Sequence, residues 1–401
     1  MTLPFIDTSS PAGPPKPAAG LNLRSLLEEM VSRNASDLHI VAGEKPKLRV
    51  DGDITNASSD YELTPKDTLH LAYSVLTEQQ KKRFELEDEL DFSFGIQNLA
   101  RFRGNVFKQR GCVSMVVRQI PFAIKTFDQL GLPGSIAKMA EKPRGLVLVT
   151  GPTGSGKSTT LAAMIDKINR ERKGHIITVE DPIEFIHKHQ SCIINQREIG
   201  SDTKSFANAL KYALREDPDI ILVGEMRDLE TIAATLTIAE TGHLAFATLH
   251  TNSAAEAINR IIDVFPSHQQ SQVRAQLAFV LEGIVTQTLL PKATGKGRVM
   301  AAEILVVTPA IRALIRDDKV HQIYSSMQAG KKFGMQTLND ALYQLYMARE
   351  VTADECLRVS SDPTEFQRMI GQLPADDDGS GKPAGAKPAT ARPGAGSPVR
   401  R

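Results

Sequence analysis

Nine consecutive residues have the side-chain types and the spacing that bind a polyphosphate. They read Gly-Pro-Thr-Gly-Ser-Gly-Lys-Ser-Thr and match the phosphate-loop pattern, in which two glycines frame the loop and a lysine and a hydroxyl residue follow. Glycines let backbone N–H groups turn toward a polyphosphate, and a helix N-terminus adds partial positive charge. We expect the lysine to reach the β- and γ-phosphates and the next serine to ligate Mg²⁺. The candidate binding residues are Gly151, Pro152, Thr153, Gly154, Ser155, Gly156, Lys157, Ser158 and Thr159.

A glycine-rich turn between a strand and a helix would give a similar stretch, so the neighbouring sequence has to decide between the two interpretations. Residues 145–150 form a short apolar run that is typical of a buried strand. Residues 157–172 place Leu161, Met164 and Ile165 at helical spacing. Strand, loop and helix thus occur in the order that a phosphate loop requires. The sequence predicts a site for a nucleoside triphosphate.

Acidic residues follow two further apolar runs. Residues 175–180 lead into an acidic stretch that includes Glu184, and residues 219–224 lead into Glu225. In open parallel sheets, ligands bind beyond the carboxyl ends of the strands, so we expect these side chains to face the nucleotide. P-loop NTPases place the acid that holds Mg²⁺ or its water where Glu225 stands. For Glu184, a capped turn before Pro182 is the structural alternative.

A histidine and several arginines are further candidates. His250 follows a third apolar strand, where a polar side chain can sense a γ-phosphate, although a single histidine is more often structural. The pattern of the arginines alone favours a solvated face of edge strands. The alternative is that one or two of them contact a triphosphate, since arginine suits bidentate phosphate contacts. These basic residues are Arg101, Arg103, Arg110 and Arg118.

The elements that position these residues divide the chain into two folded units. Up to residue 120, short helices mix with alternating strands, and from residue 145 apolar strands alternate with helices, which predicts a parallel sheet with both faces covered. We expect one helix over 268–290 and an amphipathic helix over 310–317, with its arginines on the polar side. The predicted organisation is a disordered arm (1–20), an α+β domain (21–120), a linker (121–143), an α/β domain with C-terminal helices (144–372) and a disordered tail (373–401).

Composition narrows the classes of function. The chain has 401 residues, with 48 basic and 47 acidic side chains, so no global field favours nucleic acid or an acidic membrane. Its three cysteines are widely spaced, which excludes a four-cysteine zinc site and a disulfide framework and suits a reducing cytoplasm. No apolar run reaches the length of a membrane span, and no signal peptide opens the chain. We expect a cytoplasmic protein.

Four motifs occur in order along the chain. They are Gly-Pro-Thr-Gly-Ser-Gly-Lys-Ser-Thr (151–159), Thr-Val-Glu-Asp-Pro-Ile-Glu-Phe (178–185), Ile-Leu-Val-Gly-Glu-Met-Arg-Asp (221–228) and Thr-Gly-His-Leu-Ala-Phe-Ala-Thr-Leu-His-Thr-Asn (241–252). Together they resemble the secretion-type hexameric ATPases of the type II secretion and type IV pilus superfamily. Residues 35–40, 101–110 and 310–317 resemble the branch of type IV pilus retraction ATPases, the PilT family. In the last stretch, Ala313 and Asp317 stand where the retraction motif has Asn and Glu.

The resemblance implies a fold and an assembly. The fold is α/β, with a PAS-like α+β N-terminal domain followed by a RecA-like P-loop ATPase domain, and six chains form a homohexamer. ATP with Mg²⁺ would sit between the two domains, at or near the subunit boundary. Arg103 and Arg118 are the arginines that family position favours for the phosphates, which reverses the preference for a solvated face. The lack of an extra N-terminal domain and of a four-cysteine motif favours retraction over assembly.

The resemblance also implies roles for single residues. Ser158 and Glu225 would hold Mg²⁺, Glu225 through a water molecule. Glu184 or Glu225 would orient or deprotonate the attacking water. His250 would report the nucleotide state to the ring. Lys157 and the two arginines would offset charge on the transferred phosphoryl group.

The implied function is an ATPase motor for pilus retraction and twitching motility. Its expected partners are an inner-membrane pilus platform protein and an accessory retraction ATPase, with peripheral association at the cytoplasmic face of the inner membrane, and no nucleic acid. Two close alternatives are a PilU-like accessory retraction ATPase and a pilus extension or type II secretion ATPase. Alternatives from other classes are a RecA-like nucleic-acid motor and a nucleotide-binding regulator without turnover.

Overall fold

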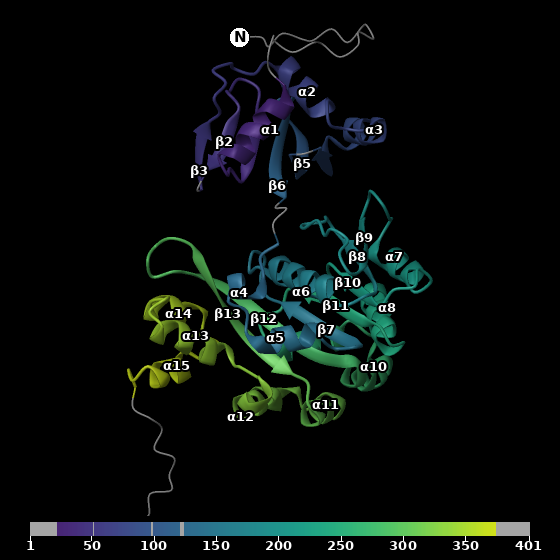
Figure 1. The fold of residues 1–401 in the computed structure, drawn as a ribbon, viewed down its shortest axis with the longest axis vertical. Coiled ribbons are helices and arrows are strands. Elements are labelled where there is room, and N and C mark those ends of the chain that lie inside the picture. The colour runs from purple at the N-terminus through teal and green to yellow at the C-terminus, as the bar shows by residue number, and fades with distance from the viewer. Residues whose placement is uncertain (1–21, 51, 98, 121–123, 374–401) are drawn as a thin grey trace, which may run out of the picture.

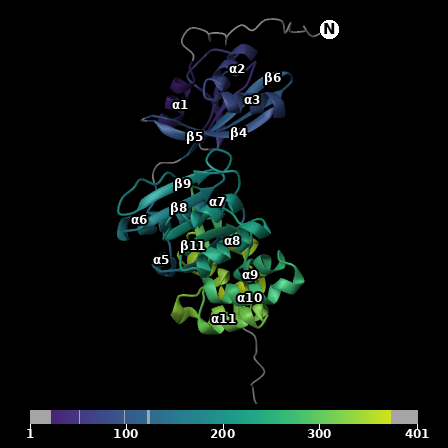
Figure 2. The same cartoon turned by 90° about the vertical axis from the view of Figure 1, so that its right-hand side faces the viewer.

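The computed structural model describes residues 22–50, 52–97, 99–120 and 124–373. In these ranges the chain forms two units, each built on one β-sheet (Figures 1 and 2). The predicted disordered arm lies outside the described residues, and so does the predicted tail except for Leu373. No helix of the described ranges is long and apolar enough to cross a membrane.

The first unit is a six-stranded sheet with three helices, as the α+β pattern predicted. The strand order is β3-β2-β1-β6-β5-β4, and every neighbouring pair is antiparallel. The strands are β1 (Asp37–Ile40), β2 (Lys47–Val50), β3 (Asp53–Asn56), β4 (Glu89–Ile96), β5 (Ala100–Gln109) and β6 (Cys112–Ile120). The helices are α1 (Leu23–Ser32), α2 (Pro65–Tyr73) and α3 (Glu78–Glu87). Thr64 and Thr77 start α2 and α3 with reciprocal capping boxes, which satisfy backbone N–H groups that a helix start leaves unpaired.

Strand β5 shows how alternation directs the arginines of this unit. Phe102 and Val106 lie in the apolar core that the three helices share. Arg101 and Arg103 alternate with them and therefore project from the opposite face of the sheet. A Cβ atom at Gly104 would lie 2.4 Å from the Phe92 ring, so only glycine fits there. The face that the helices leave open is therefore the face that carries the basic residues.

The second unit is a seven-stranded sheet in the order β13-β12-β7-β11-β10-β8-β9. Its neighbouring strands run parallel, except that β13 is antiparallel to β12. The strands are β7 (Gly145–Thr150), β8 (His175–Glu180), β9 (Ile193–Glu198), β10 (Ile220–Val223), β11 (Leu244–Leu249), β12 (Leu281–Pro291) and β13 (Arg298–Val306). Every residue of β7, β10 and β11 is buried, as expected for a parallel sheet covered on both faces.

Helices cover this sheet on both faces. Val147 and Val149 of β7 belong to one apolar core with Met164 of α6, whereas Leu146 and Leu148 belong to a second core with residues of α8, α9 and α10. Alternate residues of a strand point to opposite faces, so the two cores lie on opposite sides of the sheet. The helices are α6 (Lys157–Glu171), α7 (Phe206–Ala213), α8 (Leu229–Glu240), α9 (Ala254–Asp263) and α10 (Ser267–Val280). The predicted α/β architecture is confirmed.

The prediction of one helix over 268–290 is wrong. Helix α10 ends at Val280, and the chain continues directly as β12, which pairs with β7 on one side and β13 on the other. The apolar residues of this stretch fit helical spacing, but Ile284, Val285 and Thr286 form a β-branched run that packs well in a sheet. Periodicity alone cannot separate a short buried strand from a helix. β13, β9, α7 and α8 were not predicted either.

The predicted linker contains two short helices that belong to the second unit. They are α4 (Phe127–Leu130) and α5 (Gly134–Ala140), and Ile136 and Met139 of α5 are buried in the same core as α6. A Cβ atom at Gly283 of β12 would lie 2.4 Å from the end of the Met139 side chain, so α5 packs closely on that strand. We propose that the division between the two domains lies ahead of α4 and that the rest of the predicted linker is part of the ATPase domain.

The C-terminal part adds five helices and two 3-10 turns in the described ranges. The helices are α11 (Pro309–Arg316), α12 (Ile323–Ala329), α13 (Leu338–Met347), α14 (Ala353–Val359) and α15 (Pro363–Met369), and the turns are η1 (Val320–Gln322) and η2 (Lys331–Phe333). α11 is amphipathic as predicted, with Ile311 and Ile315 buried. Arg316 is exposed, but Arg312 is half-buried and donates to the carbonyls of Ala278 and Phe279 (2.6 and 2.7 Å) at the end of α10. One of the two arginines is thus a structural cap.

Candidate active site

The phosphate-loop pattern forms a tight turn between β7 and α6. Gly151, Gly154 and Gly156 have φ angles of 136°, 79° and 90°, a region that side chains rarely adopt. A Cβ atom at Gly151 would also lie 2.3 Å from the carbonyl oxygen of Gln287. Gly156 is the N-cap of α6, so the loop presents the positive end of that helix. This backbone has the shape and the polarity that bind an anion.

Lys157 folds over the loop. Its ammonium donates to the carbonyl oxygens of Gly151 (2.8 Å) and Pro152 (3.2 Å). Partial burial lowers the pKa of Lys157, while the nearby carboxylates of Glu225 and Glu184 act in the opposite direction. The structure therefore brings both predicted acids into the electrostatic environment of the predicted phosphate-binding lysine. Ser158 and Thr159 are half-buried in the first turn of α6.

Strand β12 contacts the loop and the end of β7 through hydrogen bonds. Gln287 donates through Nε2 to the carbonyl of Ser155 (2.8 Å), and the hydroxyls of Thr150 and Thr286 lie 2.8 Å apart. In the described part of the chain, the buried Ser155 hydroxyl and the Oε1 atom of Gln287 have no hydrogen-bond partner. Sequence reasoning missed these supporting residues because it assigned 281–290 to a helix. The β-branched run is the signal that could have found the strand.

Glu225 and His250 lie together at the ends of the neighbouring strands β10 and β11. The distance from His250 Nε2 to Glu225 Oε1 is 3.0 Å, and Arg227 donates to the same oxygen through Nε (2.5 Å). The Glu225 side chain is 20% exposed, whereas that of Arg227 is 77% exposed. Arg227 is not among the residues singled out from the sequence. The predicted acid and the predicted histidine are thus in direct contact.

The acidic stretch after β8 is held by buried carboxylates. Glu180 accepts from the Thr178 hydroxyl (2.6 Å), from Gln196 (3.3 Å) and from the backbone N–H of Glu184, and burial raises its pKa. Glu198, at the end of β9 and paired in register with Glu180, accepts from the backbone N–H of Ile183 (3.2 Å). Glu184 itself is exposed. The backbone of Glu184 is therefore held by hydrogen bonds, while its carboxylate is exposed to solvent.

Arg103 and Arg118 contact carboxylates of their own sheet. Arg118 donates through Nε to Asp37 (2.8 Å), and the Arg103 guanidinium lies 3.7 Å from Asp91. Both side chains are exposed, at 68% and 46%, and the two residues are register partners on β6 and β5. No polar contact described for them reaches the phosphate loop. Arg101 is the arginine that crosses between the units, because it lies 3.2 Å from Glu198.

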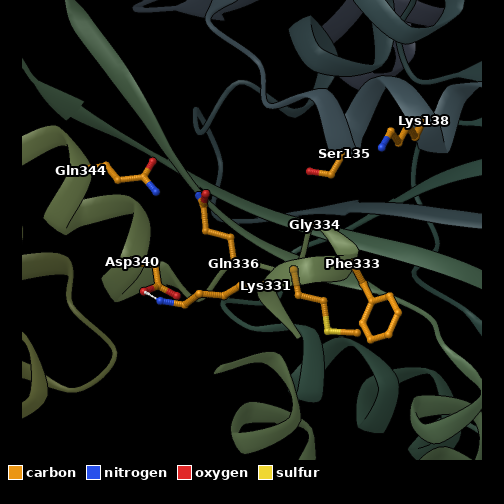
Figure 3. Close-up of a pocket in the computed structure, with 9 residues that line it drawn as sticks. Ser135, Lys138, Lys331, Phe333, Gly334, Gln336, Asp340 and Gln344 are labelled. Atoms are coloured by element: carbon orange, nitrogen blue, oxygen red, sulfur yellow. Dashed lines mark hydrogen bonds and ion pairs between the residues drawn. The ribbon is translucent and has the colours of Figure 1, made fainter. Parts of the chain in front are cut away.

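Cavities in the described part of the chain include two beside the second sheet. The larger, about 310 Å³, is a polar pocket that holds none of the predicted site residues (Figure 3). It is lined by Ser135 and Lys138 of α5, Lys331 and 333–336, and Asp340 and Gln344 of α13, and the Lys331 ammonium pairs with Asp340 at 2.7 Å. The smaller, about 220 Å³, borders Pro152 of the phosphate loop. Its lining also includes Glu303. The carboxylate of Glu303 is buried, which raises its pKa, and it accepts from the backbone N–H of Ala254 (2.7 Å).

Known proteins resemble the chain in sequence and in overall fold. Residues 18–358 match the family model described as Type II/IV secretion system protein. The type IV pilus retraction ATPase PilT of Pseudomonas aeruginosa is 49% identical over 346 residues, which cover 86% of this chain and 100% of that protein. The type IV pilus ATPase PilU of the same organism is 43% identical over 350 residues, or 87% of this chain and 91% of that protein. A crystal structure of the pilus retraction motor PilT with bound ADP superimposes with a TM-score of 0.82 and 51% identity, covering 87% of this chain and 99% of that one.

Proposed function

The chain belongs to the type II/IV secretion system protein family, in the branch of type IV pilus retraction ATPases, the PilT family, and from that premise we propose that it is the ATP-hydrolysing motor of pilus retraction. Hydrolysis disassembles the pilus and thereby drives twitching motility. One observation carries the proposal: the Glu225–His250 pair and Glu184 lie near the lysine of a phosphate loop, at the carboxyl ends of parallel strands. This is where open α/β sheets bind their ligands.

Lys157 and the loop backbone bind the phosphates. The two carbonyl contacts of the ammonium are to the loop itself, and a triphosphate offers it stronger, charge-assisted partners in the same place. Gly154 and Gly156 hold the backbone in the left-handed region that lets N–H groups turn inward. The nucleotide-binding loop also includes Gly151, Pro152, Thr153, Ser155 and Thr159.

The residues near the loop fit Mg²⁺. In the described ranges, no group of three His, Cys, Asp or Glu side chains could by itself hold a metal ion. Mg²⁺ in nucleotide sites needs no such cage, because phosphate oxygens and waters fill most of its coordination shell. The Ser158 hydroxyl and the Glu225 carboxylate are the two protein groups that would complete it. When bound there, Mg²⁺ would supply positive charge that offsets the charge developing on the transferred phosphoryl group.

A carboxylate prepares the attacking water. Glu184 is exposed with a fixed backbone, and Glu225 is held by His250 and Arg227, so each can orient a water or accept its proton. His250 contacts Glu225 directly, which lets a change at the γ-phosphate reach the end of β11. His250 therefore reports the nucleotide state to the rest of the molecule.

Arg103 and Arg118 complete the site from a second surface. Both are exposed on the open face of the first sheet, where they are paired only with carboxylates of that sheet in the described contacts. In a homohexamer this face lies at the subunit boundary and brings the two guanidinium groups to the phosphates, where they offset transition-state charge. The ring acts on an inner-membrane pilus platform protein from the cytoplasmic face, together with an accessory retraction ATPase.

The first test is the Lys157→Ala variant. Because the ammonium is the cation that the phosphate loop offers to the phosphates, its loss should abolish Mg-ATPase activity in a phosphate-release assay. Arg83→Ala, which removes an exposed arginine paired with Glu87 on α3, is the matched control and should keep full turnover. Normal turnover in Lys157→Ala would contradict the site assignment.

The PilU-like role is the second candidate, since a PilU protein is 43% identical to the chain. The two roles differ in what a deletion strain loses. Loss of twitching with surface pili still present supports the main retraction motor, and twitching that persists supports the accessory role. Loss of the pili themselves would point to extension.

A further inference from the structure

The two units touch through a charged contact between Arg101 and Glu198. Arg101 of β5 donates through Nη2 to Ser93 of β4 (2.9 Å) and to Glu198 Oε2 of β9 (3.2 Å). The Ser93 hydroxyl donates to the other carboxylate oxygen of Glu198 (2.6 Å). Both oxygens of Glu198 are thus held by the first unit. In Figure 2 the β4 and β5 side of the first sheet faces the β9 end of the second.

This contact is desolvated. The Glu198 side chain is 5% exposed and that of Arg101 is 29% exposed. In the described chain the buried Nε atom of Arg101 has no partner, so the guanidinium is oriented by Ser93 and Glu198 alone. Removing one partner of a buried ion pair leaves the other charge uncompensated, which is strongly destabilising. Docking of the first unit therefore supplies two donors to Glu198, in addition to the Ser201 hydroxyl of its own unit (3.3 Å).

Glu198 also holds the loop that carries Glu184. It accepts from the backbone N–H of Ile183 (3.2 Å) through Oε2, the same oxygen that Arg101 contacts. Ile183 is 3% exposed and directly precedes Glu184. A shift of the Glu198 carboxylate is therefore transmitted over one residue to a candidate catalytic acid.

We propose that Arg101 is a positioning residue for ATP hydrolysis: through Glu198 it fixes the loop that carries Glu184, so this acid is placed for catalysis only while the first unit is docked on β9. The inference rests on the proposed function and on the role given there to Glu184. When the first unit moves away, Glu198 loses two donors, and its hold on the Ile183 N–H changes. Domain movement and water activation are thereby coupled through one carboxylate.

The test measures kcat for phosphate release and the ATP dissociation constant for assembled wild-type protein and for Arg101→Ala, Ser93→Ala, Glu198→Gln and the double variant Arg101→Ala/Glu198→Gln. We expect kcat to fall roughly 10- to 100-fold in Arg101→Ala, as misplacement of a catalytic group by about 1 Å does, with ATP affinity within about threefold of wild type. Arg101→Lys keeps the positive charge but loses the planar guanidinium group, so its kcat should lie between those of wild type and Arg101→Ala. The double variant should be no worse than the more impaired single variant, since both act through one contact.

Hydrogen exchange supplies a structural readout that does not depend on activity. The peptide over 180–186 should exchange faster in Arg101→Ala and in Ser93→Ala, a milder change that keeps both charges. Arg83→Ala should match the wild type in exchange, kcat and affinity. Additive losses in the double variant, weakened ATP affinity with unchanged kcat, or unchanged exchange over 180–186 would each overturn the proposal. Failure of the proposed function is seen separately, as wild-type protein without turnover or Lys157→Ala with normal turnover.

Discussion

At the residue scale, the proposed chemistry depends on a few polar side chains that differ in exposure and in hydrogen-bond partners. The Glu225 carboxylate is shared by His250 and Arg227, whereas Glu184 is exposed. Lys157 lies close enough to both acids to respond to their charge. The loop thus combines a lysine that can pair with phosphates and nearby carboxylates that suit a metal ion.

Glu225→Gln tests the acid next to the histidine. Glutamine keeps the shape but loses the charge, so kcat should fall at least about 100-fold, while ATP still binds through the loop. Phosphate release and equilibrium nucleotide binding measure the two effects. Glu230→Gln, at an exposed acid in the first turn of α8, is the control. Turnover near the wild-type rate would rule out Glu225 as base and as metal ligand.

The buried His187 makes the free energy of unfolding depend on pH. Burial lowers the pKa of this histidine to about 4, and in the described chain its Nδ1 atom has no partner. The unfolded chain, with a pKa near 6.5, therefore binds the proton more tightly, so stability is full above about pH 6.5 and is lost as pH falls toward 4. Between pH 7 and pH 5 the loss is about 2 kcal/mol, or a few degrees in Tm. In His187→Gln this part of the Tm decrease should vanish, whereas in His268→Gln, an exposed control, it should persist.

At the element scale, the candidate site is a set of strand ends, and β12 is a strand that contacts the phosphate loop directly. Its pairing with β7 places Gln287 under Ser155 and Thr286 against Thr150. The carbonyl of Gln287 also occupies the space that a side chain at Gly151 would need. The loop is therefore shaped from the strand beside it as well as by its own glycines.

Gln287→Ala tests that support. The Ser155 carbonyl would lose its buried donor, at a cost of about 1–2 kcal/mol, so ATP affinity should weaken roughly tenfold. Isothermal titration with a non-hydrolysable ATP analogue measures the change. Gln276→Ala removes an exposed contact from α10 to Glu240 of α8 and should leave ATP affinity unchanged. Equal affinity in both variants would show that β12 does not order the loop.

At the scale of the whole molecule, the first unit has two roles on one face of its sheet. Arg101 and Ser93 dock on the second unit of the same chain, while Arg103 and Arg118 remain exposed beside them. A surface that is held at one end and open at the other suits a ring, in which the open arginines meet the phosphate loop of a neighbouring subunit. This division of labour is our proposal for how the homohexamer completes its sites.

Mixing two inactive variants tests this arrangement. Lys157→Ala lacks a working loop, and Arg118→Ala lacks a guanidinium group, but a site formed across the boundary between them contains both intact groups. Mixed rings should therefore regain part of the ATPase activity that each variant lacks alone. Activity that stays at the level of the separate variants would mean that Arg118 acts within its own subunit.

Sequence alone predicted the phosphate loop, the acids and the histidine that follow the apolar strands, and the division into an α+β and an α/β unit. These features are local: glycine spacing, apolar runs and the residues at their ends are visible in short windows. Tertiary structure decided which strands are neighbours. It placed β10 beside β11, so that Glu225 meets His250, and it inserted β12 beside β7 where a helix was expected. It also selected Arg101 as the arginine between the units, because pairing and docking join residues 97 positions apart, and no local pattern encodes that contact.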